Sequence, residues 1–362
     1  MNKSLYSLKT AAITWYLDLV DKLESIGFRI SEHDECLFLR GSTAILVHVD
    51  DLAIFNDPDH TVEKELHALL KISALSQDRY LGLEVRKQLD GSVKLSQEAY
   101  TREILQEYKD LIRQSNTPIS KRAQGNDAKA SFSEVKQFQR FVGKIMFLAC
   151  QTRPDLTYAV IQISSYASNP SPSAWEVARD ILGYLDQTSH YSLWIQKGAS
   201  STPCPEEFQI TQYCDASFAT GSKGRSITGA ITVLGNTPLL WFSRQQTSVA
   251  TSTAHSEFIA AYNAALAVLP LYPLLQEILS DRDIPKPRLI TDNLATLTTA
   301  NTGLLTRQNR HFLVKYYWLH EQLAQDTLIA GWVPTDQQLA DLLTKPPSPQ
   351  MLKSFCSFIG LG

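Results

Sequence analysis

A pair of adjacent carboxylates between two apolar runs constrains the fold of this chain more than any other feature. Residues 45–49 (Ile-Leu-Val-His-Val) and 52–55 (Leu-Ala-Ile-Phe) have the composition of strands, whereas the intervening Asp50 and Asp51 favour a turn. The stretch therefore predicts a buried β-hairpin with both acids at its tip. Two unit charges about 4 Å apart repel by roughly 4 kcal/mol at an effective dielectric constant of about 20, and a bound divalent cation would reverse this repulsion. The alternative is an ordinary hairpin with a solvated Asp-Asp turn.

Length and composition predict a soluble, globular chain of two or three domains. The 362 residues are 44% apolar, which is enough to build several cores. We expect no secretion and no membrane association, because no apolar signal core follows the N-terminus and the apolar stretch 260–275 contains Pro270 and Pro273.

The five cysteines are scattered and odd in number, so they predict neither a disulfide framework nor a zinc site and fit a reducing compartment. With a net charge of −3, contacts to nucleic acid would have to come from local clusters of Lys and Arg.

The order of the predicted elements indicates four segments. Helices alternate with short strands through residues 1–115, which is typical of an α+β domain. The polar stretch 116–133 predicts a mobile linker, and the rest of residues 116–207 is expected to form three helices that end at a second polar boundary. Residues 208–346 form the third segment, and residues 347–362 are expected to be a C-terminal tail.

Four acids occupy unusual positions in the third segment. Its strands are predicted at 210–214, 227–234, 239–243, 288–291 and 328–333, and its helices at 253–269, 310–324 and 339–343. Asp215 and Asp292 each follow a strand, Glu257 lies early in a helix, and Asp341 begins the last helix. Each acid alone is more often a cap, a turn former or a solvated residue. Only the set as a whole indicates a site.

Several short motifs, in this order, resemble the Pol polyprotein of copia-type long-terminal-repeat retrotransposons. They are residues 5–16, 27–28, 34–38, 49–51 and 80–85 in the first segment, and 213–217, 226–229, 256–261, 291–293 and 338–346 in the third. The resemblance implies a truncated reverse-transcriptase palm, a helical connection segment and a ribonuclease H-like domain. The fold class is then α+β and α/β, with a five-stranded mixed sheet and flanking helices. Asp50 and Asp51 would be two of the three metal-binding acids of the polymerase.

The resemblance also implies a function for the third segment. Asp215, Glu257, Asp292 and Asp341 match the Asp-Glu-Asp-Asp set of ribonuclease H, which cleaves RNA in an RNA–DNA hybrid with two Mg²⁺ ions about 3.5 to 4 Å apart. Asp215 would bridge both ions, with Mn²⁺ as an alternative metal, because hard cations prefer oxygen ligands. Without metal the acids should raise one another's pKa values, so metal binding should stabilise the domain. RNA would be distinguished through 2′-hydroxyl and phosphate contacts.

Basic residues near these acids are candidates for binding the phosphates of the hybrid. They are Lys9 in the first segment and Lys223, Arg225, Arg307, Arg310, His311 and Lys315 in the third. A solvated basic helix face is the alternative. The family often has Arg-Thr-Lys-His-Ile-Asp where this chain has residues 308–313, so the grip on the substrate is expected to differ. The aromatic run 316–318 is expected in the core.

The first segment departs from the polymerase pattern. The third acid belongs to a strand that this sequence does not contain, and Asp18 and Asp21 lie in a helical pattern instead. The fingers are missing as well. Other residues replace those of the family at Ser7, Thr10, Ala12, Ile13, Thr14 and His48. We expect no polymerase activity from this chain.

Two other functions fit parts of the sequence pattern. One is a decayed remnant that folds and at most binds nucleic acid. The other is an integrase or transposase, but those enzymes use an Asp-Asp-Glu order, whereas Glu257 comes second here.

Association with other Pol or Gag products is expected, and the oligomeric state is left open. The expected location is the cytoplasm, with a virus-like particle or the nucleus as alternatives.

Overall fold

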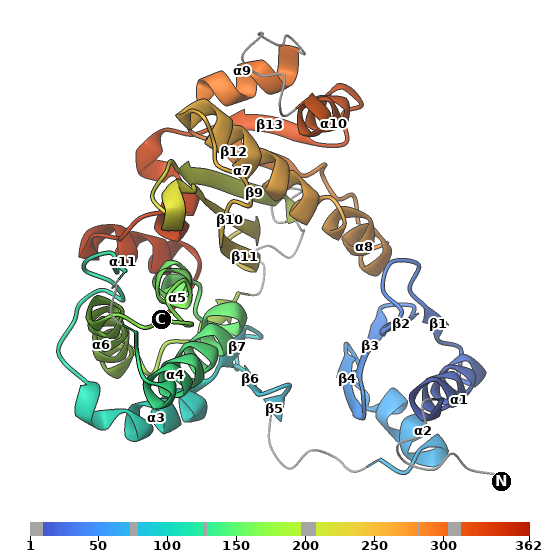
Figure 1. The fold of residues 1–362 in the computed structure, drawn as a ribbon. Helices are drawn as coiled ribbons and strands as arrows, with labels where there is room; N and C mark the ends of the chain where they lie inside the picture. Colours follow the sequence, from blue (N-terminus) through green and yellow to red (C-terminus); the bar gives the residue numbers. More distant parts are fainter. Residues whose placement is uncertain (1–9, 73–78, 126–128, 197–207, 281, 303–312) are drawn as a thin grey trace. The chain divides into compact units, whose positions relative to one another are not determined.

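The chain folds into two compact units. The computed structural model describes residues 10–72, 79–125, 129–196, 208–280, 282–302 and 313–362. The first unit comprises residues up to Leu81 together with Pro270–Ile284, and the second comprises Gly82–Leu269 with Pro285–Gly362 (Figure 1). These divisions differ from the segment boundaries expected from the sequence. The helical insertion Pro270–Ile284 interrupts the second unit along the chain but folds with the first.

The first unit is a small α+β assembly around one antiparallel sheet. Its elements are α1 (Ala11–Ser25), β1 (Arg29–Ile30), β2 (Leu37–Arg40), β3 (Thr43–His48), β4 (Asp51–Phe55), α2 (Thr61–Leu69), β5 (Arg79–Tyr80) and α8 (Leu271–Ile278). Strands β1 to β4 pair in sequence order. Leu23 of α1, Phe38 of β2 and Ile45 of β3 are fully buried in the shared core. Glu277 of α8 accepts hydrogen bonds from the backbone N–H of Glu32, which ties the insertion to this unit.

The second unit begins with a helical region that carries a small sheet of its own. Its elements are β6 (Leu83–Lys87), β7 (Val93–Ser96), α3 (Glu98–Glu107), η1 (Lys109–Leu111), α4 (Phe132–Gln151), η2 (Pro154–Leu156), α5 (Thr157–Ser164), α6 (Pro172–Gln187), β8 (Leu193–Ile195) and the C-terminal α11 (Pro349–Phe358). A capping box formed by Ser131 and Glu134 starts α4. Helices α4 and α6 cover two of the three expected helices, whereas the helix expected at 152–156 is only the short turn η2 that precedes α5. A fully buried Arg153–Asp155 ion pair lies between α4 and α5.

Two expectations for this region are wrong. The polar stretch 116–133 is not a mobile linker where it is described, because Ile119 and Ala123 are buried and Ser120 donates to the buried Asp180 at 2.6 Å. Few apolar residues are needed when a buried acid fixes the backbone. The expected tail at 347–362 contains α11, whose Phe355 lies in the helical core, so the chain is packed to its last residues.

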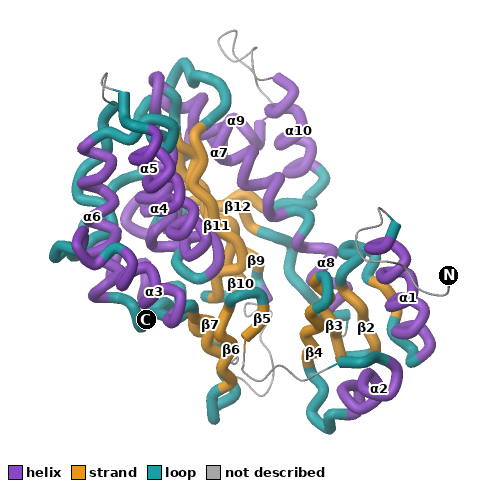
Figure 2. The backbone as a smooth tube through the Cα atoms, turned by 60° about the horizontal axis from the view of Figure 1, so that its bottom comes forward, coloured by secondary structure: helices purple, strands orange, loops and turns teal. Residues whose placement is uncertain are grey.

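The rest of the second unit is the predicted mixed sheet. The strands are β9 (Ile210–Ser217), β10 (Ile227–Leu234), β11 (Thr237–Gln245), β12 (Arg288–Thr291) and β13 (Ile329–Trp332), with α7 (Thr253–Val268), α9 (Leu294–Thr302), α10 (Leu313–Ala324), η4 (Ser222–Gly224), η6 (Thr335–Gln337) and η7 (Leu339–Leu343) around them. The order is β11-β10-β9-β12-β13, which places β9 at the centre (Figure 2). Strands β9, β10 and β11 are antiparallel, whereas β12 is parallel to β9 and β13. The five-stranded mixed sheet and its helices are confirmed.

Helix α7 explains the most apolar part of the chain. The stretch Thr253–Ile278 is long and apolar enough to cross a membrane by length and composition. In the fold, however, α7 packs on the central sheet and fully buries Ala260, Ala264 and Val268. The helix stops at Val268, and Pro270 precedes α8. Its apolar composition is therefore accounted for by packing on the sheet.

Candidate active site

The central strand of the mixed sheet supplies the first acid. Asp215 lies near the end of β9, opposite Gly229 of β10, and is only 3% exposed. The strand runs three residues further than the sequence predicted, so Asp215 projects from a rigid element. Its Oδ2 accepts a hydrogen bond from the hydroxyl of Thr344. This contact fixes the carboxylate beside the segment that follows η7.

Glu257 and Asp292 come from elements on either side of β9. Glu257 of α7 is 7% exposed, and its Oε2 accepts a hydrogen bond at 3.2 Å from the backbone N–H of Ala216, the residue after Asp215. Asp292 follows β12 and is half-buried. Its Oδ2 accepts from the Thr335 hydroxyl at 2.8 Å, and its carbonyl oxygen accepts from the Trp332 indole N–H at 3.0 Å. Both acids are thus held by short contacts to neighbouring elements.

Asp341 completes the set from the short helix η7. Its side chain is buried, and the Nζ of Lys345 lies 2.8 Å from its Oδ1. This ion pair compensates the charge of the buried carboxylate and lowers its pKa. Gln338 donates to the Cys214 carbonyl oxygen at 3.1 Å, which holds η7 against the strand that carries Asp215. The last predicted helix is therefore a 3₁₀ turn docked on β9.

The acids interact electrostatically across these elements. Burial raises the pKa of Glu257 to about 9, and the charges of Asp215 and Asp292 add to this shift. Burial also raises the pKa of Asp341 to about 6, with Asp215 as the next cause. The pKa of Asp215 is raised by burial as well, although Lys345 and the Thr344 hydroxyl oppose the shift. The four acids that the sequence selected are therefore close enough for their charges to affect one another's pKa values.

The side chains fit a hard cation chemically, although they are not arranged around one here. Among the described residues, no group of three or more His, Cys, Asp and Glu side chains is placed to hold a metal ion. Each carboxylate contacts a protein group instead, as described above. The donor set nevertheless consists of carboxylate oxygens, and it includes the buried Asp341 Oδ1, which already pairs with a cation, the Lys345 ammonium group. These are the ligands that Mg²⁺ or Mn²⁺ would take.

The acidic hairpin of the first unit has a different environment. A turn between β3 and β4 carries Val49 and Asp50, and His48 pairs with Asp51. The hairpin is confirmed, but the prediction of burial holds only for the body of β3, since Val49 is 68% exposed and both acids are exposed. Water solvates these carboxylates, so a counter-cation is not needed to hold them together. Val49 has a φ of 53°, an unfavourable conformation for a β-branched residue.

The predicted basic residues are only partly described. Lys223 and Arg225 lie in the connection between β9 and β10, just beyond the end of the strand that carries Asp215. Lys223 is exposed and Arg225 half-buried. Lys315 of α10 has its Nζ 5.3 Å from the ring centre of Tyr262. The remaining candidates, Lys9, Arg307, Arg310 and His311, lie outside the described residues. In the aromatic run, Tyr316 is fully buried as expected, whereas Tyr317 is 57% exposed.

The sequence analysis missed the residues that support the acids. Besides Thr335, Thr344 and Lys345, the most informative is Gly229 in the interior of β10. A Cβ at position 229 would lie 2.7 Å from Leu343 Cβ and from Thr344 Cγ2, so only glycine lets η7 approach the sheet. A glycine inside a predicted strand was the available signal, because it often marks a close approach of another backbone.

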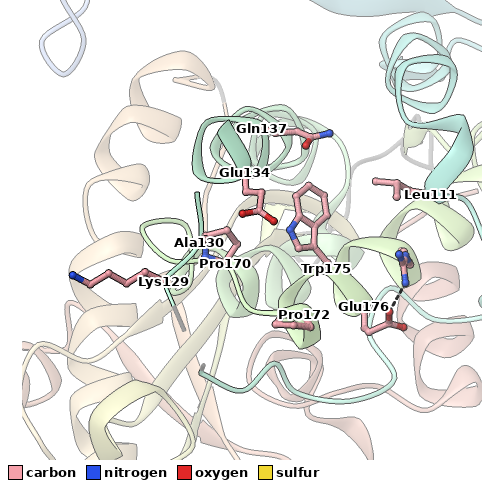
Figure 3. Close-up of a pocket in the computed structure, with 10 residues that line it drawn as sticks. Leu111, Lys129, Ala130, Glu134, Gln137, Pro170, Pro172, Trp175 and Glu176 are labelled. Carbon is pink, nitrogen blue, oxygen red and sulfur yellow. Dashed lines mark hydrogen bonds and ion pairs between the residues drawn. The ribbon is translucent and has the colours of Figure 1, made fainter. Parts of the chain in front are cut away.

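A separate cavity of about 530 Å³ lies in the helical region and contains none of the predicted site residues. Figure 3 shows Trp175, Glu134 and Glu176 among its lining residues. Its acids already have structural roles, because Glu134 caps α4 and Glu176 pairs with Arg113 and Arg179. The cavity therefore offers no free acid for chemistry.

Together, the elements define a class of protein. A four-stranded antiparallel sheet, a helical region and a five-stranded mixed sheet occur in one α+β chain. Residues 1–120 match a family model described as reverse transcriptase (RNA-dependent DNA polymerase). All of the chain aligns with the Pol polyproteins of the Arabidopsis thaliana transposons RE1 and RE2, at 31% and 29% identity, and 95% of it aligns with that of transposon TNT 1-94 of Nicotiana tabacum, at 26%.

Over its whole length the chain is similar to the Pol polyproteins of copia-type retrotransposons. It spans about a quarter of the length of these relatives, covering 25%, 25% and 27% of RE1, RE2 and TNT 1-94. Among solved structures, the N-terminal ribonuclease H domain of Rv2228c from Mycobacterium tuberculosis aligns with 41% of this chain and 97% of its own, at 13% identity and a TM-score of 0.29. Prototype foamy virus protease–reverse transcriptase aligns with 94% of this chain and 62% of its own, at 13% identity and a TM-score of 0.28.

Proposed function

We propose that the second unit cleaves the RNA strand of RNA–DNA hybrids with two divalent cations, Mg²⁺ or Mn²⁺. Asp215, Glu257, Asp292 and Asp341 would hold the ions. When bound, such ions lower the pKa of an attacking water and neutralise the charge that develops on the leaving oxygen. The contribution of the chain is to fix the four carboxylates on separate rigid elements, so that they are oriented before substrate arrives.

The observation that carries this proposal is the burial of interacting acids. Asp215, Glu257 and Asp341 are each less than one-tenth exposed, and burial raises the pKa of each of them, with the charge of at least one neighbouring acid adding to the shift. Burying several ionisable acids together destabilises a protein by several kcal/mol unless a positive charge compensates. Such an arrangement is typical of functional sites rather than of structural cores.

Substrate binding is proposed for the connection between β9 and β10. Lys223 is exposed there, and Arg225 lies two residues further on. Cations at this end of β9 would bind hybrid phosphates next to the acids, which would position the scissile bond without reading sequence. Raising the salt concentration should therefore weaken hybrid binding, because neutralised phosphates release their counterions.

A hybrid-cleavage assay tests the proposal. A fluorescently labelled RNA–DNA hybrid would be incubated with the purified chain in Mg²⁺ or in EDTA, and wild type would be compared with Asp215→Asn. We expect cleavage only by wild type in Mg²⁺. Equal cleavage by both proteins would show that the assignment is wrong.

A catalytically inactive remnant is the second candidate function. It is favoured by the lack, among the described residues, of three ligand side chains placed to hold one ion. This candidate predicts hybrid binding without metal-dependent cleavage, so the same assay separates the two.

We also propose that the chain has no DNA polymerase activity. Asp50 and Asp51 are exposed at the hairpin tip and belong to no described group of three possible metal ligands. Primer extension on an RNA or DNA template should therefore be absent. Template-directed nucleotide incorporation by the purified chain would contradict this proposal.

A further inference from the structure

A lysine side chain lies among the four acids. The Nζ of Lys345 is 2.8 Å from Asp341 Oδ1, and the backbone N–H of Lys345 donates to the Asp341 carbonyl oxygen at 3.1 Å. The neighbouring Thr344 donates to Asp215, so the lysine follows directly on a residue that touches the central acid. The Lys345 charge also lowers the pKa values of Asp215, Glu257 and Asp341.

We propose that Lys345 is a positioning residue that acts as a built-in counter-ion for the acid site and competes with the metal ion bound by Asp341. This inference rests on the proposed nuclease function. Its ammonium group occupies the position beside Asp341 Oδ1 that a cation ligated by this oxygen would need. Because a lysine side chain is long and flexible, it can leave this position when a doubly charged ion arrives.

The packing of η7 explains why the lysine is held there. Gly229 has no side chain, so η7 and Thr344 lie directly on β10. Gln338 secures the start of η7 to β9 through the Cys214 carbonyl oxygen. With both ends of the turn fixed, the side chain of Lys345 leaves the backbone next to the acids. Its remaining exposure of 40% gives it a route to solvent.

Two consequences follow from competition between the ammonium group and the ion. Before metal binds, Lys345 compensates part of the charge of the acids, so the metal-free site stays closed and ordered. When metal binds, the ion has to displace the ammonium group, which weakens metal affinity relative to a site without the lysine. A purely structural lysine would have the opposite effect, because its loss would disorder the acids and weaken metal binding.

Calorimetric titration of the full chain with Mn²⁺ alone separates these roles. The variants are Lys345→Met, Lys345→Gln as a second uncharged replacement, Lys345→Arg to restore the charge, and Lys353→Met as a control at an exposed position of α11. We expect the Met and Gln variants to bind Mn²⁺ about tenfold more tightly than wild type, with metal-free melting temperatures below that of wild type. The Arg variant should restore most of both properties, and Lys353→Met should change neither.

Unchanged or weaker Mn²⁺ binding by both uncharged variants would overturn the role of Lys345. In that case wild type would still bind Mn²⁺ and Asp215→Asn would not, so the proposed function would survive. If wild type and all Lys345 variants bound no Mn²⁺, the proposed function itself would fail, and the competition would fail with it. The two failures are therefore distinguishable in one set of titrations.

Discussion

The two acidic sites of this chain differ in their exposure to water. Asp50 and Asp51 are adjacent in sequence, yet both are exposed at the tip of a hairpin. Asp215, Glu257 and Asp341 are far apart in sequence, yet they are buried together at the mixed sheet. Adjacent acids in water need no partner, whereas buried acids need a compensating cation. Burial, rather than spacing along the chain, is therefore the reason why we propose the metal site at the mixed sheet.

Replacing one acid in each site should give the largest contrast. Asp341→Asn removes a buried carboxylate charge that the proposed metal site requires, so hybrid cleavage should fall by a factor of about 10³, the size expected when stabilisation of transition-state charge is lost. Asp51→Asn, a matched change at an exposed acid outside this site, should leave cleavage at the wild-type level. Initial rates on a labelled hybrid measure both. A loss of cleavage in Asp51→Asn would break the contrast.

The approach of η7 to the sheet is the next target. Gly229→Ala would place a methyl group 2.7 Å from two side-chain atoms, so we expect a loss of about 2 kcal/mol in the free energy of unfolding. Gly143→Ala is the matched control, because no atom lies within 4 Å of the added group in α4. It should stabilise the chain by about 0.5 to 1 kcal/mol. Urea unfolding measures both, and an unaffected Gly229→Ala would contradict the close packing described here.

The raised pKa of Glu257 predicts how the metal-free protein depends on pH. The folded-state pKa is about 9 against a reference of 4.5, so the folded protein binds more protons than the unfolded chain between these values. The contribution of Glu257 to stability is therefore fully present below pH 4.5 and is lost as the pH rises through about 9.

Glu257→Gln should remove this loss. The neutral amide keeps an acceptor for the Ala216 N–H, so at pH 8 without metal the variant should be about 1 to 2 kcal/mol more stable than wild type. At pH 4.5 the two proteins should be nearly equal. Melting temperatures in EDTA across this range test the prediction, and parallel pH curves for the two proteins would contradict it.

The hairpin tip should give the smallest effect. Val49→Asn replaces a β-branched residue at a φ of 53° with one that tolerates this conformation, so the hairpin should gain about 1 kcal/mol. Hydrogen exchange of the β3 and β4 amides should slow several-fold, while the amides of β9 should not change. Faster exchange in the hairpin would indicate that Val49 makes contacts that outweigh its strain.

Much of the architecture could be predicted from local sequence patterns. The run 227–234 has the alternation and β-branched content of a strand and forms β10 with those bounds. The deciding interactions of such a strand lie within one element. The four acids were selected in another way, as a set, through their order along the chain and the resemblance to ribonuclease H.

The support of the site could not be predicted in the same way. Lys345 looks like an ordinary exposed lysine, and its role depends on a short turn that packs on the distant Gly229. The stretch 116–125 has the composition of a linker. The contact that orders it is made with Asp180, which lies far away in the sequence on α6. In both cases the stabilising contact joins residues far apart in the chain, which composition does not report.

The central claim is that the buried acids, and not the exposed pair, bind the metal. Its most direct test is the stoichiometry of Mn²⁺ binding at pH 8, measured by calorimetry for wild type, Asp215→Asn and the double variant Asp50→Asn/Asp51→Asn. We predict two ions for wild type and for the double variant, and none for Asp215→Asn. Full binding by Asp215→Asn, or its loss in the double variant, would contradict the account.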